Sequence, residues 1–153
     1  KDLSVQYMRQ GVLSIFFDFI ASEYGPRKKL THRNIYHMTE NDELRIHLNS
    51  CVKAFRDYLN RENMGIENST KEDILSRLRK HKAFIEYRPR CQVGYAVDGN
   101  DRPVLRTNGH SYEPYSPTNV VVMDMVALRN EFSLPEVHWT GVHPNVKPVP
   151  QAS

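Results

Sequence analysis

Apolar residues recur at steps of three and four along the first third of the chain, the spacing of a helix packed along one face. The first such stretch predicts a helix over Leu3–Glu23, which the Gly25-Pro26 pair would end because proline cannot continue a helix. The second predicts a helix over Glu40–Arg61 with Asn41 as its N-cap. The basic segment between them, Arg27–His37, is expected to be a loop.

A third helix is predicted by a capping signal. Ser69 and Glu72 have the spacing of a capping box, in which a hydroxyl and a carboxylate each accept a hydrogen bond from the other residue's amide. The helix is expected to run from Thr70 to about Lys82. Its apolar residues would point inward and its many basic residues outward. The expected inward residues are Ile74, Leu75 and Leu78.

Two short alternating stretches follow and predict a β-hairpin. Gln92–Val97 and Arg102–Thr107 would be its strands, and Asp98–Asp101 is rich in residues that tolerate the backbone angles of a tight turn. Pro103 lacks an amide proton, so the returning strand is expected at the edge of a sheet or to start late.

The last apolar stretch, Val120–Met125, is short and continuous enough to be a buried strand, and Val126–Phe132 is expected to be a helical turn after it. Residues 133–153 are rich in proline and predict an extended tail. The predicted fold class is α+β, with a helical N-terminal half followed by a winged-helix-like unit whose wing is the hairpin. The expected domain is 1–132, with a helical part over 1–68 and a winged-helix-like part over 69–132.

Composition adds a location for the positive charge. The 153 residues suit one domain with its own core, and the net charge is +3. Residues 71–106 hold nine basic and five acidic residues, so they carry a net charge of +4. A polyanion would therefore be bound in this central stretch.

Cysteine content and hydropathy give weaker expectations about context. Two cysteines, Cys51 and Cys91, are too few for a disulfide framework, so we expect free thiols and a reducing cytoplasm or nucleus. No apolar run reaches the roughly 20 residues of a membrane span. The chain begins with Lys1 and not with methionine, so we expect a processed form or a piece of a longer protein.

A basic helix followed by a basic hairpin is typical of a nucleic-acid-binding surface. The major groove of a duplex admits one α-helix, and arginine and lysine neutralise phosphates. The sequence therefore predicts a non-catalytic domain that binds nucleic acid, DNA in preference to RNA, with no metal or cofactor. The alternative is a small α+β domain whose basic face is only solvated. The predicted phosphate contacts are Lys71, Arg77, Arg79, Lys80, Lys82, Arg88, Arg90, Arg102 and Arg106.

Two other functions stay open at this point. A protein-interaction module could use the helix over residues 3–20 or the tail over 133–153 to bind a partner. A small metal-dependent nuclease could be built from scattered carboxylates, although two of them lie in the hairpin turn, where turn chemistry explains them. Neither a phosphate-binding loop nor a nucleophile elbow nor a His-Glu-x-x-His zinc motif is present. The candidate carboxylates are Asp73, Glu86, Asp98 and Asp101.

The stretch VKAFRDYLNRENMG followed by NSTKEDILSRLRKHKAFIEY, within Asn49–Tyr87, also resembles part of a known family. It is similar to the region after the ATPase core of phage- and poxvirus-type primase–helicases of superfamily 3. There, a helix with aromatic spacing precedes a Ser/Thr-capped helix and a winged-helix domain. The resemblance implies an accessory domain that helps a viral replication enzyme hold DNA, through the exposed face of Lys71–Lys82 and the hairpin. The long extension Asn108–Ser153 departs from that pattern.

Overall fold

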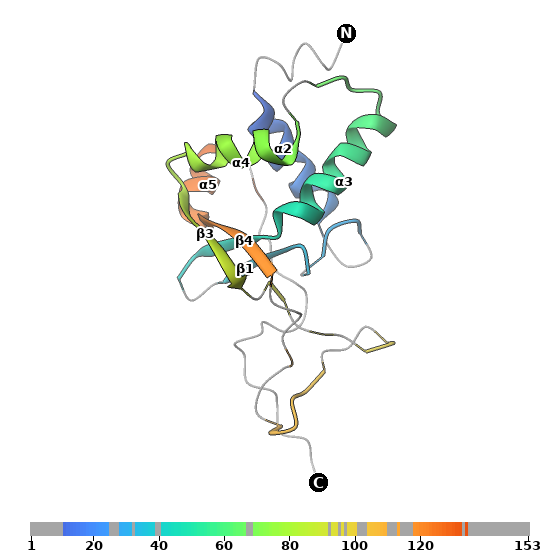
Figure 1. Cartoon of the computed structure of the whole chain (residues 1–153), viewed down its shortest axis with the longest axis vertical. Helices are drawn as coiled ribbons and strands as arrows, with labels where there is room; N and C mark the ends of the chain where they lie inside the picture. The colour runs from blue at the N-terminus through green and yellow to red at the C-terminus, as the bar shows by residue number, and fades with distance from the viewer. Residues whose placement is uncertain are drawn as a thin grey trace.

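The structure is a computed structural model, and Figure 1 shows the path of the chain through its helices and strands. It contains four helices and a four-stranded antiparallel sheet among the described residues, so the predicted α+β class is confirmed. No described helix has both the length and the apolar character that crossing a membrane requires. The described residues are 11–24, 28–31, 33–38, 41–66, 69–91, 93–94, 96, 98–100, 104–109, 113, 118–132 and 134.

The sheet is organised around strand β4 (Thr118–Asp124), which pairs antiparallel with β2 on one side and with β3 on the other. The four residues from Val120 to Met123 are all fully buried. A strand covered on both faces needs apolar residues at successive positions, so the continuous run in the sequence correctly predicts a buried strand. The strand order is β1 (Ile35–Met38), β2 (Glu43–Ile46), β4 and β3 (Phe84–Cys91).

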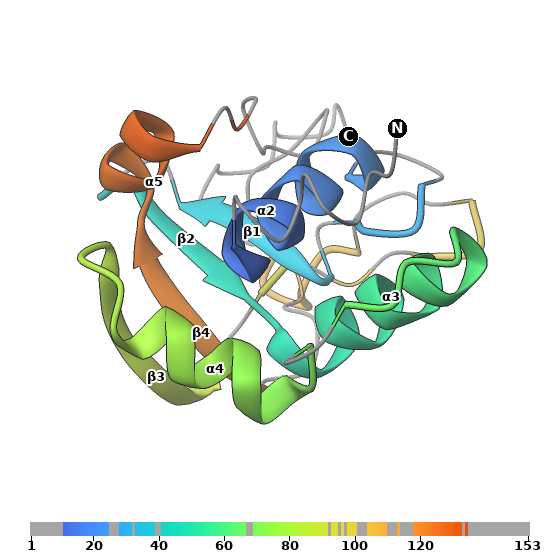
Figure 2. The same ribbon diagram turned by 90° about the horizontal axis from the view of Figure 1, so that it is seen from above.

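The two faces of the sheet have different covers. Val121 and Met123 of β4 belong to the main core with the helices, whereas Val120 and Val122 belong to a second buried cluster. Successive side chains of a strand point to opposite faces, so this second cluster lies on the face away from the helices. Figure 2 shows α2, α3 and α4 gathered on one side of the strands.

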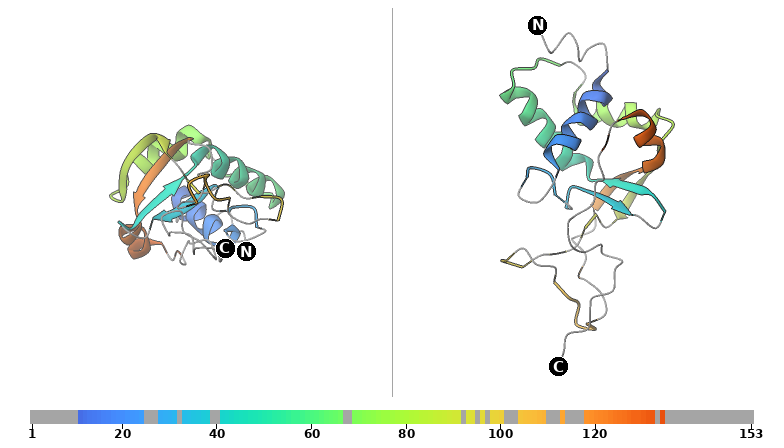
Figure 3. Two further views of the ribbon diagram at one scale, coloured as in Figure 1. Left: turned by 90° about the horizontal axis from the view of Figure 1, so that it is seen from below. Right: turned by 180° about the vertical axis from the view of Figure 1, so that it is seen from behind.

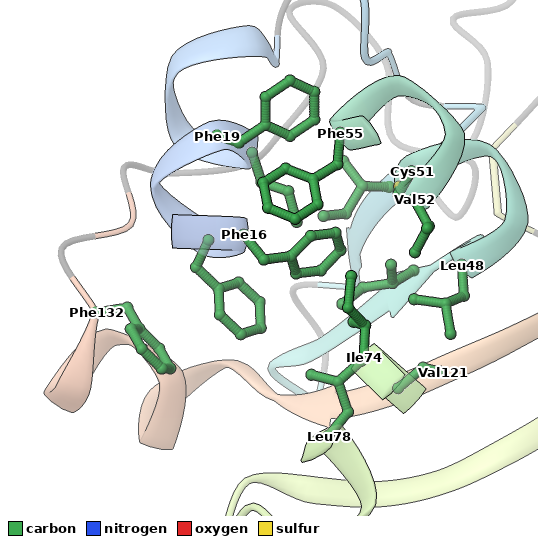
Figure 4. Close-up of a cluster of buried hydrophobic side chains, with 14 of the residues drawn as sticks. Phe16, Phe19, Leu48, Cys51, Val52, Phe55, Ile74, Leu78, Val121 and Phe132 are labelled. Atoms are coloured by element: carbon green, nitrogen blue, oxygen red, sulfur yellow. The ribbon is translucent and has the colours of Figure 1, made fainter. Parts of the chain in front are cut away.

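The main core is built from helices α2 (Val12–Glu23), α3 (Leu48–Arg61) and α4 (Lys71–Arg79). The ring of Phe55 in α3 lies edge-on to Phe16, with 5.3 Å between the centroids, and 5.4 Å from Phe19. Figure 4 shows these rings between α2 and α3, with Ile74 and Leu78 of α4 beside Val121. The apolar stripes of three helices thus meet over one face of the sheet.

The N-terminal half contains two strands that the sequence interpretation missed. The expected helix over 3–23 begins at Val12 in the described part, because Gly11 has a φ of +85° and is its N-cap. Strand β1 lies partly in the expected loop over 27–37. Strand β2 and its preceding turn, where Asp42 has a φ of +52°, replace the first part of the expected helix over 40–61. The prediction of Asn41 as an N-cap is wrong, since α3 begins at Leu48 after His47.

The capping box of α4 is present but one residue later than predicted. Thr70 is the N-cap: its Oγ1 accepts from the Asp73 amide at 3.2 Å, and Asp73 Oδ2 accepts from the Thr70 amide at 3.3 Å. The helix ends at Arg79, three residues before the predicted Lys82. Helix α5 (Met125–Glu131) follows β4 directly, which agrees with the predicted helical turn.

A winged-helix arrangement is not shown. Strand β3 occupies the stretch directly before the expected hairpin, and Pro89 is tolerated in it because β3 is an edge strand. Within the hairpin, the Asn100 amide donates to Asp98 Oδ1 at 2.8 Å and the Val104 amide donates to the Ala96 carbonyl at 3.0 Å, so the chain does turn there. The described pieces of 98–109, gold in Figures 1 and 3, lie on the other side of the sheet from α4.

Candidate nucleic-acid interface

Four predicted phosphate contacts lie together at the C-terminal end of α4. Ile74 and Leu78 are fully buried and four residues apart, so they fix one face of the helix against the core. The opposite face is left to solvent. The basic side chains at and just beyond the end of the helix are exposed: Arg77, Arg79, Lys80 and Lys82.

These four cations have no carboxylate within ion-pair distance in the part of the chain that the structure describes. Arg79 makes a different contact, since its guanidinium carbon lies 5.7 Å from the ring centroid of Tyr87 on β3. A guanidinium over an aromatic ring keeps its charge and its outward N–H donors. A hollow of about 390 Å³ beside it is lined by Leu75, Ser76, Lys80 and others. We call the four exposed cations the α4 basic cluster; two of them, Arg79 and Lys80, line this hollow together with the acidic Glu72.

Lys71 lies apart from this cluster, at the other end of the helix, and is half-buried. Its charge acts on His47. The pKa of His47 is lowered from 6.5 mainly by burial and to a smaller extent by the positive charge of Lys71. Buried imidazoles lose the hydration that stabilises their charged form. Lys71 therefore lies near His47, at the opposite end of α4 from the α4 basic cluster.

Arg88 was predicted as a phosphate contact, but its guanidinium is already bound to carboxylates. Its Nη1 and Nη2 donate to the two oxygens of Glu43 at 3.1 and 3.3 Å, and Nη2 also donates to Glu86 at 3.1 Å. Hydrogen bonds to Glu86 and then to Glu43 raise its pKa further above its ordinary value. Arg88 pairs with Val120, whose side chain is on the face away from the helices, so Arg88 and α4 lie on opposite sides of the sheet.

The two other predicted contacts that the structure describes, Arg90 and Arg106, belong to other segments than α4. Arg90 is exposed, with a φ of +51°, in the irregular part of β3. Arg106 Nε lies 3.8 Å from Glu113 Oε2, and both side chains are about half-exposed. Arg102 lies outside the described residues. Among the predicted contacts that the structure describes, those of the α4 basic cluster are brought together, and Arg88, Arg90 and Arg106 lie outside it.

Sequence reasoning missed two residues that decide this outcome. Tyr87 supports Arg79 through its ring, and Glu43 binds Arg88 from a strand 45 residues earlier. The Tyr87 contact follows from β3 running beside α4, which a strand assignment at 84–91 would have indicated. Glu43 carried no local signal, because its contact depends on the order of the strands.

The carboxylates considered for a nuclease have structural partners where they are described. Asp73 caps α4, Glu86 binds Arg88 and Asp98 accepts from the amide of its own turn. Asp101 lies outside the described residues. Within the part of the chain that the structure describes, no three His, Cys, Asp or Glu side chains are grouped to hold a metal ion.

Comparison with known proteins adds no family. No protein-family model, no curated protein and no solved structure matches this chain. The resemblance to primase–helicases therefore stays a hypothesis, and the α4 basic cluster is the structural feature on which a function can be proposed.

Proposed function

We propose that this chain is a non-catalytic nucleic-acid-binding domain that grips the phosphates of DNA with the α4 basic cluster. The observation that carries the proposal is the gathering of Arg77, Arg79, Lys80 and Lys82 within six residues, all exposed and none paired with a described carboxylate. Phosphate neutralisation by such groups supplies most of the non-specific affinity of proteins for DNA.

The shape of the cluster favours backbone contact over base reading. The cations lie at the end of a nine-residue helix, not along its length, and the outer face of the helix also carries the exposed Glu72. A helix that reads bases in the major groove presents a row of side chains to base edges. The proposal therefore keeps α4 as the element that meets duplex phosphates and does not require a wing on the same side.

A bland explanation competes with this one, because basic residues at a helix C-terminus are also favoured by the helix dipole. Arg77 and Arg79 lie in the last turn and satisfy that preference. Lys80 and Lys82 add positive charge at and beyond the C-terminal end of α4, which is more than the preference of the helix dipole requires. The two explanations differ in whether the cations bind a polyanion, so binding has to be measured.

The test is the salt dependence of binding to a labelled duplex, with single-stranded DNA and RNA as comparison probes. Arg77 and Lys80 are three residues apart on α4, and Lys53 and Arg56 have the same spacing and are also exposed on α3. The double change Arg77→Gln and Lys80→Gln should reduce the log–log salt slope by about 1.8, roughly 0.9 for each lost phosphate contact on B-DNA.

The matched variant Lys53→Gln with Arg56→Gln loses the same charge and should keep the slope within about half a unit, less than one contact. Equal losses in the two variants would mean that only the net charge matters, and the α4 site would be wrong. Absence of binding to all three probes at low salt would refute the function itself.

The protein-interaction alternative gains no support from the described part of α2. Its large apolar residues are buried in the core except Leu13, which is partly buried against it. The exposed large apolar residues that the structure describes are Ile85, Val104, Leu105 and Val126. Residues 3–10 and the tail over 135–153 lie outside the described part, so their role as partner sites stays a prediction.

A further inference from the structure

A second hollow adjoins the α4 basic cluster, since Arg77 and Lys80 line it. It is a pocket of about 340 Å³ between the first turn of α2, the end of α4 and the end of α5. Its size is at the lower end of the roughly 300–1,000 Å³ of small-molecule sites. The polar lining comes from Ser14, Arg77, Lys80, His81 and Glu131.

The two cations of this pocket are available to a ligand. Arg77 and Lys80 are exposed and have no carboxylate within ion-pair distance among the described residues. They enter the pocket from the same side, since they lie one helical turn apart. Two cationic donors converging on one hollow form the arrangement that binds a compact anion.

Among the described residues that line the pocket, the one acid is Glu131, which is held by His81. Glu131 Oε2 lies 2.7 Å from His81 Nε2, and His81 Nδ1 accepts a hydrogen bond from the Ala83 amide at 3.0 Å. Because Nδ1 acts as an acceptor, the proton of the neutral ring is on Nε2 and is donated to Glu131. The Glu131 carboxylate is therefore held at His81, and among the described lining residues it is outnumbered by the two cations Arg77 and Lys80.

The part of the pocket wall that comes from α2 is also compatible with an anion. It is the first turn of α2, whose N-cap, Gly11, has no side chain to accept hydrogen bonds from the turn. First-turn amides of a 12-residue helix point out of its end and favour negative charge. The helix end adds to the attraction of an anion, but the main observation is that Arg77 and Lys80 line the same pocket.

We propose that this pocket binds a phosphomonoester, and specifically the terminal phosphate of a nucleic-acid strand, so that the domain prefers strand ends. The inference rests on the proposed function. A terminal phosphate carries close to two negative charges at pH 7, as a phosphorylated side chain does, and is compact enough to enter a hollow. A continuous backbone would instead lie along the exposed face of α4. Lys80 is on that face and lines both hollows.

The experiment compares three oligonucleotides of one sequence that carry a 5′ phosphate, a 3′ phosphate or no terminal phosphate. At least one phosphorylated strand should bind about tenfold or more tightly than the unphosphorylated one, because charge-assisted hydrogen bonds to the terminal phosphate are stronger than neutral ones. Arg77→Gln should abolish this preference, and Lys53→Gln should leave it unchanged.

A second variant acts in the opposite direction and guards against a general loss of structure. Glu131→Gln removes the negative charge of the described pocket lining, and the new side chain can still accept a hydrogen bond from His81. It should therefore strengthen binding of the phosphorylated strand by several-fold. A variant that merely disturbed the fold would weaken binding, so weaker or unchanged binding of the phosphorylated strand would overturn the assignment.

The outcomes separate this inference from the proposed function. Salt-dependent binding without any preference for a terminal phosphate would overturn the inference and leave the function standing. Absence of binding by every oligonucleotide would refute both. If a nucleoside monophosphate bound in an Arg77-dependent way while the strands showed no preference, the pocket would belong to a free nucleotide, and the strand-end assignment would be wrong.

Discussion

The pair of Arg88 and Glu43 offers a sharp test of which cations hold the fold and which are free for a ligand. The pair joins β3 to β2 across β4, through two guanidinium–carboxylate hydrogen bonds of 3.1 and 3.3 Å. The Glu43 side chain is 13% exposed and that of Arg88 is 28% exposed. We expect Arg88→Met to destabilise the protein and to leave nucleic-acid binding unchanged.

The magnitude follows from the partial burial of the pair. Exposed ion pairs contribute about 0.2–1 kcal/mol, and hydrogen bonds to charged groups that are screened less contribute about 1.5–3 kcal/mol. A half-buried bidentate pair falls between them, so we expect a coupling energy of about 1–2 kcal/mol. Arg45 Nε lies 3.6 Å from Glu43 and remains beside it after Arg88 is replaced. The loss of stability in Arg88→Met is therefore smaller than it would be for an isolated pair.

The assay is a double-mutant cycle of Arg88→Met and Glu43→Gln, with free energies of unfolding measured in urea. Methionine keeps the apolar stem of the arginine, so the cycle isolates the charged contact. A coupling energy below about 0.5 kcal/mol would refute a structural role for the pair, because independent sites add to within that margin. A reduced salt slope in Arg88→Met would show that Arg88 contacts phosphate after all.

Three further predictions concern the core and the buried titratable groups. Phe55→Ala should lower the free energy of unfolding by about 3–5 kcal/mol, because the ring contacts Phe16 and Phe19; a loss below about 1 kcal/mol in urea unfolding would contradict this packing. The pKa of His47 is lowered in the folded protein, so the unfolded chain binds a proton first as the pH falls through 6.5. The free energy of unfolding should therefore decrease below this pH, and it should decrease less in His47→Asn. Equal pH profiles of stability in the two proteins would contradict this prediction. Burial raises the pKa of Cys51 to about 12, so its thiol should not react with a thiol reagent at pH 8 until urea unfolds the protein, and rapid labelling of the folded protein would contradict its burial.

Local signals in the sequence predicted those elements that local contacts determine. Helix α4 was predicted within three residues, because its cap and its two inward residues all lie inside one segment. Strand β4 was predicted because a continuous apolar run is what burial on both faces requires. The α4 basic cluster could be predicted for the same reason, since a helix fixes which of its residues face outward.

Strands β1 and β2 could not be predicted because their stability comes from distant partners. Each has only four residues, and all four residues of β1 are buried, so it shows no alternation. Leu44 fits a helical stripe as well as a strand. The pairing of β2 with β4, about 80 residues later, decides between the two. Arg88 was assigned to the ligand site for the same reason, because Glu43 reaches it only through this strand order.

The central claim is that nucleic acid lies on the exposed side of the α4 end, and site-directed crosslinking tests it most directly. Ser76 is exposed in the hollow beside Arg79 and Lys80, and Asn60 is exposed on α3. A photoactivatable thiol reagent on Ser76→Cys should crosslink a labelled duplex, and the same reagent on Asn60→Cys should not, while the buried native thiols stay unlabelled. Crosslinking from position 60 with none from position 76 would contradict the proposed site.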